Sequence, residues 1–230
     1  MPKFLNFILV GLLLAAGFLP YQSPYIFALT AFGAAVLVTV VNFYSQNRSV
    51  LPGAFVLGYL GALATVSSLS VKLVLAVLAA GVFYHYHRSL PKKPAFLDEE
   101  FFIMAAAILL FSALWGLNFF FTPPWWTTSL LTFGLFLPIL REAFWKLGSP
   151  APVLRGLLHA LILVEVTMAL LYWPVNAPTA AVVVFAVFYL QYVFSVLYYM
   201  RKLTKKRIYF HSGAISFVVL VTLLTSKWSI

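Results

Sequence analysis

The strongest constraint on this fold is a series of apolar runs separated by short polar or proline-rich connections. A membrane-spanning helix needs about 20 mostly apolar residues, within a range of about 17–25. Nine runs meet or nearly meet that length, over residues 4–19, 25–44, 50–66, 71–86, 100–121, 125–140, 153–173, 179–200 and 208–228. The sequence therefore predicts an all-α, polytopic transmembrane bundle with about nine spans, built as a single integral membrane domain over residues 1–230.

The boundary between the runs at 50–66 and 71–86 is the least marked. Its serines can hydrogen-bond to the preceding helical turn, so they do not force a helix to end. A single helix over 50–86 would be roughly 55 Å long at 1.5 Å per residue, which is too long for one crossing. We therefore expect two separate helices here. The segments at 87–99 and 141–152 are expected to be polar loops.

Small residues recur in the runs at 25–44 and 50–66, including Gly53, Gly58 and Gly61. In membrane helices, small side chains let two backbones approach closely. We interpret these glycines as packing positions rather than as a cofactor-binding motif.

The basic residues predict the orientation in the membrane. Five of the seven residues in the segment 201–207, called the basic segment below, are basic, namely Arg201, Lys202, Lys205, Lys206 and Arg207. Such clusters stay on the cytoplasmic side. With nine spans, the N-terminus is then cytoplasmic and the C-terminus outside. All 15 Lys and Arg residues except Lys72 and Lys227 then lie on the cytoplasmic side.

The composition is that of a membrane protein, and we expect it in the cell's inner (plasma) membrane. Hydrophobic residues make up 63% of the chain and charged residues only 9%, against about 25% charged residues in a soluble domain. The net charge of +10 sits in short connections, so it predicts contact with anionic lipid headgroups rather than with nucleic acid. A protein partner is a further candidate. The absence of cysteine excludes disulfides and thiolate chemistry.

Two charged residues inside predicted spans are candidate functional groups. Glu165 lies eight residues before Trp173, so it sits roughly 12 Å from the outer end of its helix. A carboxylate at such a depth is costly, usually faces the bundle interior, and serves either a function or helix–helix bonding. Lys72 either extends its side chain to the outer interface or pairs with Glu165.

His159 is the third candidate. It lies six residues before Glu165, and this spacing turns the two side chains about 120° apart on a helix. They do not form a metal pair, and a hydrogen bond to a neighbouring helix is the simpler role. The chain has no nucleophile motif, phosphate-binding glycine loop or paired intramembrane carboxylates. We therefore expect no catalytic residue, no metal and no cofactor.

The C-terminal third resembles a group of small, uncharacterised bacterial multi-pass membrane proteins. The likeness covers about 70 residues and rests on three features. These are Glu165 shortly before Trp173-Pro174, a tyrosine-rich penultimate helix, and the sequence Leu203-Thr204-Lys205-Lys206 before the last helix. The penultimate helix carries Tyr189, Tyr192, Tyr198 and Tyr199. The resemblance implies a helical membrane architecture and no particular activity.

Three functions are compatible with these observations. We favour a non-catalytic membrane component or partner-binding subunit, in which Glu165 would be sealed between helices. A small transporter that couples to protons or cations through Glu165 predicts a polar cavity reaching that residue. A membrane enzyme acting on a lipid-linked substrate predicts at least two further polar groups near Glu165, with His159, Asn118 and Gln191 as candidates.

Overall fold

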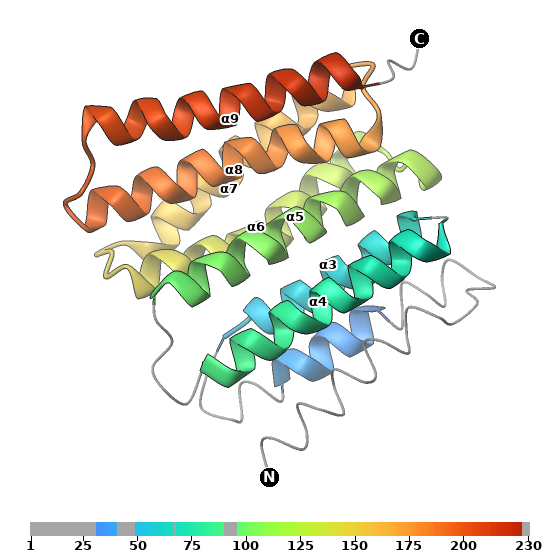
Figure 1. The fold of residues 1–230 in the computed structure, drawn as a ribbon, viewed down its shortest axis with the longest axis horizontal. Coiled ribbons are helices and arrows are strands. Elements are labelled where there is room, and N and C mark those ends of the chain that lie inside the picture. Colours follow the sequence, from blue (N-terminus) through green and yellow to red (C-terminus); the bar gives the residue numbers. More distant parts are fainter. Residues whose placement is uncertain (1–30, 41–48, 67, 90–95, 227–230) are drawn as a thin grey trace. The chain divides into compact units, whose positions relative to one another are not determined.

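The computed structural model describes residues 31–40, 49–66, 68–89 and 96–226, and these residues form helices and no strands (Figure 1). The chain divides into two compact units, Met1–Gly116 and Leu117–Ile230. After a helical segment at Ala31–Val40, the helices are α3 (Leu51–Thr65), α4 (Leu69–Ser89), α5 (Phe96–Phe121), α6 (Trp125–Lys146), α7 (Pro152–Leu171), α8 (Ala177–Tyr199) and α9 (Lys205–Thr225). The predicted span at 4–19 lies outside the described residues.

Four helices in the described part of the chain are long and apolar enough to cross a membrane. They are the Glu99–Phe119 portion of α5, together with α7, α8 and α9. Ala31–Val40, α3 and the Ser70–Tyr86 portion of α4 are apolar but shorter. The predicted all-α fold is thus confirmed for the described residues, and these four helices suit a membrane protein by length and composition. The count of nine spans and the orientation stay predictions.

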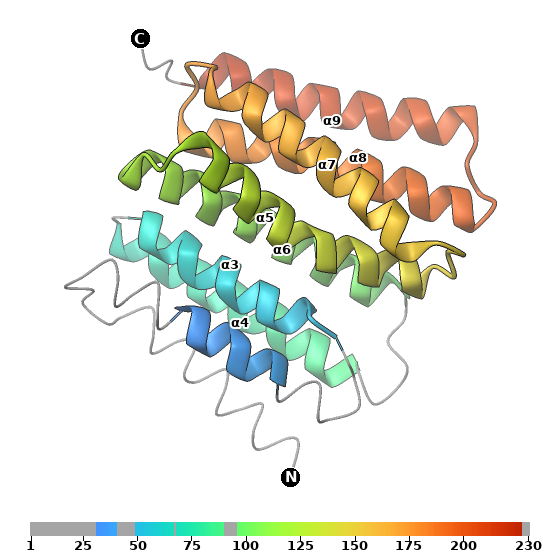
Figure 2. The same cartoon turned by 180° about the vertical axis from the view of Figure 1, so that it is seen from behind.

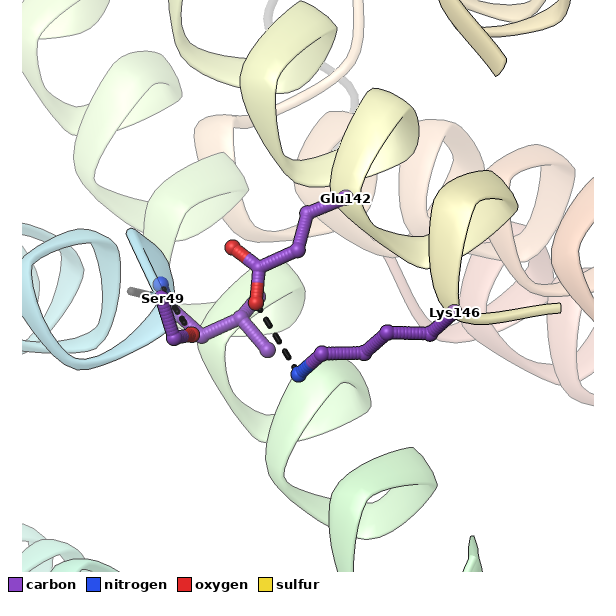
Figure 3. Close-up of polar contacts among 4 residues, drawn as sticks. Ser49, Glu142 and Lys146 are labelled. Carbon is purple, nitrogen blue, oxygen red and sulfur yellow. Dashed lines mark hydrogen bonds and ion pairs between the residues drawn. The ribbon is translucent and has the colours of Figure 1, made fainter. Parts of the chain in front are cut away.

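The predicted boundary between two helices near residue 67 is confirmed. α3 ends at Thr65, where the next residue, Val66, adopts an extended backbone with φ −96° and ψ 123°. α4 begins at Leu69. At the other end of α3, the backbone N–H of Leu51 donates a 3.2 Å hydrogen bond to Ser49 Oγ (Figure 3). This bond satisfies one of the free N–H groups at the helix start.

Helices extend into two segments that were predicted to connect spans. α4 continues to Ser89 and α5 begins at Phe96, so both enter the predicted loop at 87–99. α9 begins inside the basic segment, at Lys205, after Thr204 accepts a hydrogen bond from the backbone N–H of Arg207. Charged residues fit readily into a helical turn, so charge alone did not mark these ends.

The predicted end of α6 at residue 140 is wrong, because the helix continues to Lys146. One reason is an ion pair between Glu142 and Lys146, which are one helical turn apart, since such pairs stabilise a helix. Lys146 Nζ lies 3.0 Å from Glu142 Oε1 (Figure 3). Ala143 and Phe144 in the same turn are buried. Gly148, with φ +72°, follows the helix end, where a left-handed glycine is common.

Within the first unit, α3 and α5 lie close together at glycine positions. A Cβ added at Gly58 would lie 2.7 Å from the backbone nitrogen of Leu110, and one at Gly61 would collide with Ala113. The interpretation of these two glycines as packing positions is therefore confirmed. Gly53 likewise leaves no room for a Cβ beside Thr39.

An aromatic cluster also joins α3, α4 and α5. It consists of Phe55, Phe83, Tyr86 and Phe102, all almost completely buried. The rings of Tyr86 and Phe102 stack with centroids 3.9 Å apart, and those of Phe55 and Phe102 with centroids 4.9 Å apart. Aromatic contacts of this kind add to the free energy of burial, so the cluster is the core of the first unit.

Within the second unit, the antiparallel helices α6 and α7 form the most extensive helix pair (Figure 2). The face of α7 that packs inward carries Gly156, Ala160, Leu163, Thr167 and Leu170. These positions recur every three or four residues, as one face of a helix requires. A Cβ added at Gly156 would lie 2.9 Å from the backbone nitrogen of Arg141, so only glycine permits this approach.

α8 packs between α7 and α9 in the second unit, and among the described helices α9 packs against α8 alone (Figure 1). No residue of α9 is buried. One polar contact joins the two helices, between Tyr189 Oη and His211 Nδ1 at 2.9 Å. α9 is therefore the most weakly packed helix of this unit.

Candidate functional site

A pocket lies between α7 and α8, at the ends of these helices nearest the basic segment. Its volume is about 370 Å³, within the range of small-ligand sites. Its lining comes from the first turns of α7 and the last turns of α8, namely Arg155, His159, Gln191, Phe194, Ser195, Tyr198 and Tyr199. No acidic residue is among them. The pocket is entirely within the second unit.

The two basic groups of the pocket come from α7. Arg155 and His159 are four residues apart, so they lie on one face of the helix. The guanidinium carbon of Arg155 lies 5.1 Å from the ring centroid of Tyr199, in the range of a cation–π contact. Arg155 forms no ion pair within the described part of the chain. Its charge is therefore not neutralised by a neighbouring carboxylate.

Aromatic rings of α6 and α8 pack around the two basic side chains. The Phe144 ring lies 4.8 Å from the His159 ring and 6.4 Å from the Tyr199 ring, centroid to centroid. Tyr199 Oη donates a 2.9 Å hydrogen bond to Ser149 Oγ, which fixes the ring that lies under Arg155. The two basic side chains are thus positioned by residues outside their own helix.

The polar groups of α8 recur at helical spacing, with Gln191, Ser195 and Tyr199 each four residues apart. Ser195 Oγ donates a 2.7 Å hydrogen bond to the Gln191 backbone carbonyl and lies 3.4 Å from His159 Nε2. The side-chain amide of Gln191 is buried, and neither its Nε2 nor its Oε1 has a hydrogen-bond partner among the residues that the structure describes. A buried polar atom without a partner costs about 1–3 kcal/mol, so the amide is an unfilled donor and acceptor in the wall of the pocket.

The contact between Ser195 and His159 does not form an activated nucleophile. His159 Nδ1 lies 2.9 Å from the Arg155 carbonyl oxygen, so Nδ1 carries a proton and donates it. The single Ser195 proton goes to the Gln191 carbonyl, whereas a serine nucleophile must donate to histidine. With this assignment no proton lies between Ser195 Oγ and His159 Nε2, so the predicted role of His159 in hydrogen bonding between helices stays a prediction.

Glu165 lies on the exposed face of α7, outside the pocket. It follows Leu154, Leu158 and Leu161 along an exposed stripe of the helix, called the α7 stripe below. Glu165 makes no hydrogen bond or ion pair with any described residue. The favoured hypothesis expected a carboxylate sealed between helices, and the structure shows an exposed one instead.

The exposure of Glu165 also bears on the two alternative hypotheses. The pocket lining does not include Glu165, so it is not the polar cavity expected for the transporter. The three polar groups expected near Glu165 for the enzyme are engaged elsewhere or line the pocket. Asn118 Oδ1 accepts a 3.2 Å hydrogen bond from Thr128, and His159 and Gln191 are pocket residues. No described residue joins Glu165 in a catalytic group.

Lys72 and the basic segment complete the predicted sites. Lys72 lies on α4 in the first unit and is half-buried, and its pairing with Glu165 stays a hypothesis. All seven residues of the basic segment are exposed, and Arg207 Nη1 donates a 3.0 Å hydrogen bond to the Lys202 carbonyl. The described residues contain no group of three or more His, Asp or Glu side chains that could hold a metal.

Arg155 was not predicted as a site residue, because its charge was assigned only to topology. A usable signal was present, since Arg155 and His159 share one helix face and Gln191, Ser195 and Tyr199 share another. Comparisons of the chain with protein-family models, with curated proteins and with solved structures found no match. The function therefore has to be argued from the site itself.

Proposed function

We propose that this is a multi-pass protein of the inner (plasma) membrane that serves as a non-catalytic, partner-binding component. In this proposal the chain crosses the bilayer about nine times, with the basic segment in the cytoplasm. The distribution of Lys and Arg supports that orientation. The partner is a transmembrane helix of another protein, and it docks along the α7 stripe.

The observation that carries the proposal is the unpartnered carboxylate of Glu165 on the α7 stripe. Glu165 lies 13 residues after Pro152, roughly 20 Å along a helix that is itself roughly 30 Å long. A charged side chain facing hydrocarbon costs on the order of 2.5–3.5 kcal/mol on insertion scales. A partner that supplies a hydrogen-bond donor at this depth removes most of that cost, so the exposed carboxylate favours a bound helix.

Charge complementarity selects the kind of partner. The leucines of the α7 stripe give little preference for protein over lipid, because lipid tails are equally apolar. Binding therefore depends on Glu165, which requires a Lys, Arg, Asn or Gln side chain on the facing helix. A second copy meeting this stripe about a two-fold axis would oppose two Glu165 carboxylates, which repel each other unless one is protonated. A different protein is the better occupant.

Site-specific photocrosslinking in native membranes tests this proposal. A photoreactive amino acid placed at Leu161 should form an adduct with a transmembrane peptide that contains one of the four donor residues. Replacing Glu165 by Leu should lower the adduct yield about 3- to 30-fold, since polar contacts between membrane helices contribute about 0.6–2 kcal/mol. The same group at Phe217, exposed on α9, is the control and should give an unchanged pattern.

The outcome that overturns the proposal is an adduct at Leu161 only with lipid, with a second copy, or with the Lys72 region of the same chain. The Lys72 adduct would support the internal ion pair instead. A yield that does not depend on Glu165 would also refute the proposed role of the carboxylate.

A further inference from the structure

We propose that the pocket between α7 and α8 binds the phosphate group of an anionic ligand. The site is separate from the α7 stripe and from the basic segment, and it does not depend on the proposed partner. A phospholipid headgroup and a free phosphate compound share the required chemistry, and the experiment below distinguishes them.

The pocket contains three hydrogen-bond donors that have no acceptor among the described residues. The Arg155 guanidinium is planar, always charged and suited to two parallel hydrogen bonds with a phosphate. Gln191 Nε2 is buried without a partner, and the Tyr198 hydroxyl forms no hydrogen bond with the described residues. All three residues line one pocket, and we assign their donors to one bound phosphate.

The electrostatic setting favours an anion over a neutral or cationic ligand. The lining contains Arg155 and His159 and no carboxylate. The five basic side chains of the basic segment begin two residues after Tyr199 and add positive potential at the same end of the helices. A groove of one charge sign raises the local concentration of the opposite ion, and basic pockets between membrane helices bind phospholipid headgroups.

The depth of the pocket fits a group at the membrane surface. Arg155 lies three residues and His159 seven residues inside α7, roughly 5 Å and 10 Å from its first residue. The side chains of Tyr198 and Tyr199 belong to the last turn of α8. A phosphate in the pocket would therefore lie near the helix ends, where phospholipid headgroups are found, with Phe194 next to the acyl chains.

The test uses the full-length protein in nanodiscs and in detergent. Native mass spectrometry would compare retention of phosphatidic acid, phosphatidylglycerol and phosphatidylcholine, and competition by inorganic phosphate. We expect the two anionic lipids to be retained over phosphatidylcholine. Replacing Arg155 by Gln should weaken retention about 10- to 100-fold, as expected for loss of a charge-assisted hydrogen bond. Arg155→Lys should restore part of it.

Two further variants keep the test specific. Gln191→Leu should weaken retention about 3- to 10-fold without loss of folding, because it removes a donor. Arg207→Gln removes a charge outside the pocket and should change retention less than 2-fold. Monodisperse elution and an unchanged helical circular dichroism spectrum show that each variant is folded.

Competition with inorganic phosphate distinguishes a phospholipid headgroup from a small phosphate compound. Displacement of the lipid by millimolar inorganic phosphate indicates a site for small phosphate compounds, and retention despite it indicates a headgroup site. Both results support the proposal. It is overturned if Arg155→Gln and Gln191→Leu retain anionic lipid as the wild type does, or if Arg207→Gln weakens retention as much as Arg155→Gln.

Discussion

Replacing Gly156 by Ala should destabilise the second unit, because the added Cβ meets the backbone of α6. That Cβ would lie 2.9 Å from the Arg141 nitrogen and 3.1 Å from its Cα. Neither atom can rotate away, so α7 has to move outward by several tenths of an ångström. Overpacking of this kind costs about 1–3 kcal/mol. Alanine regains about 0.5–1 kcal/mol of helix propensity, which leaves a net loss of up to about 2.5 kcal/mol.

The matched control is Gly213→Ala on α9, where an added Cβ meets no atom within 4 Å. Only the propensity gain applies there, so this variant should be unchanged or slightly more stable. Reversible unfolding in detergent micelles, followed by circular dichroism and tryptophan fluorescence, measures both free energies. The difference between the two variants isolates the steric cost at the contact between α6 and α7.

Equal stability changes in the two alanine variants would refute this reasoning. That result would mean that the helices do not approach as closely at Gly156 as the structure shows. Because Arg155 is the preceding residue, the same displacement should also weaken anion retention in the pocket, whereas Gly213→Ala should leave it unchanged.

Three further predictions concern single contacts and topology. Gln191→Leu should raise the free energy of unfolding by about 1–3 kcal/mol in the absence of an anion, because it removes two buried polar atoms without partners; a loss of stability measured in the same detergent would contradict this. Tyr189→Phe should increase amide hydrogen exchange in α9, because it removes the hydrogen bond to His211, which contributes about 0.5–1.5 kcal/mol to stability. Tyr209→Phe removes an exposed hydroxyl and should leave the exchange unchanged. Because the chain has no cysteine, a cysteine at Lys202 should react with an impermeant maleimide only from the cytoplasm and one at Val175 only from outside. The opposite pattern would reverse the proposed orientation.

The length and spacing of apolar runs sufficed to predict helices, but not the direction in which each helix faces. In a soluble protein, polar residues mark the exposed face. In a membrane helix, the face toward lipid is as apolar as the face toward protein. The leucines of the α7 stripe and the buried Leu163 and Leu170 are therefore alike to any hydropathy argument. The inward position of Glu165 was predicted only from the cost of a carboxylate in hydrocarbon, and the leucines around it could not correct that prediction.

The glycines were more informative than the leucines. A glycine in an apolar run has a physical reason to face another helix, so Gly58 and Gly61 could be assigned to a helix contact from the sequence. The pocket could not be predicted because it needs the register between α7 and α8. That register depends on side-chain packing, including the contacts of Phe144 with His159 and Tyr199, and no local pattern encodes it.

The loose attachment of α9 has a consequence for how the protein responds to its bilayer. A helix of 21 residues is roughly 32 Å long, close to the hydrocarbon thickness of a typical membrane. Because α9 buries no residue and, among the described residues, shares one polar contact with α8, between Tyr189 and His211, we expect lipid to determine most of its tilt in a bilayer. Thinner membranes should tilt α9, and thicker ones should bring it upright. The last helix would then adjust to bilayer thickness while α6, α7 and α8 keep their packing.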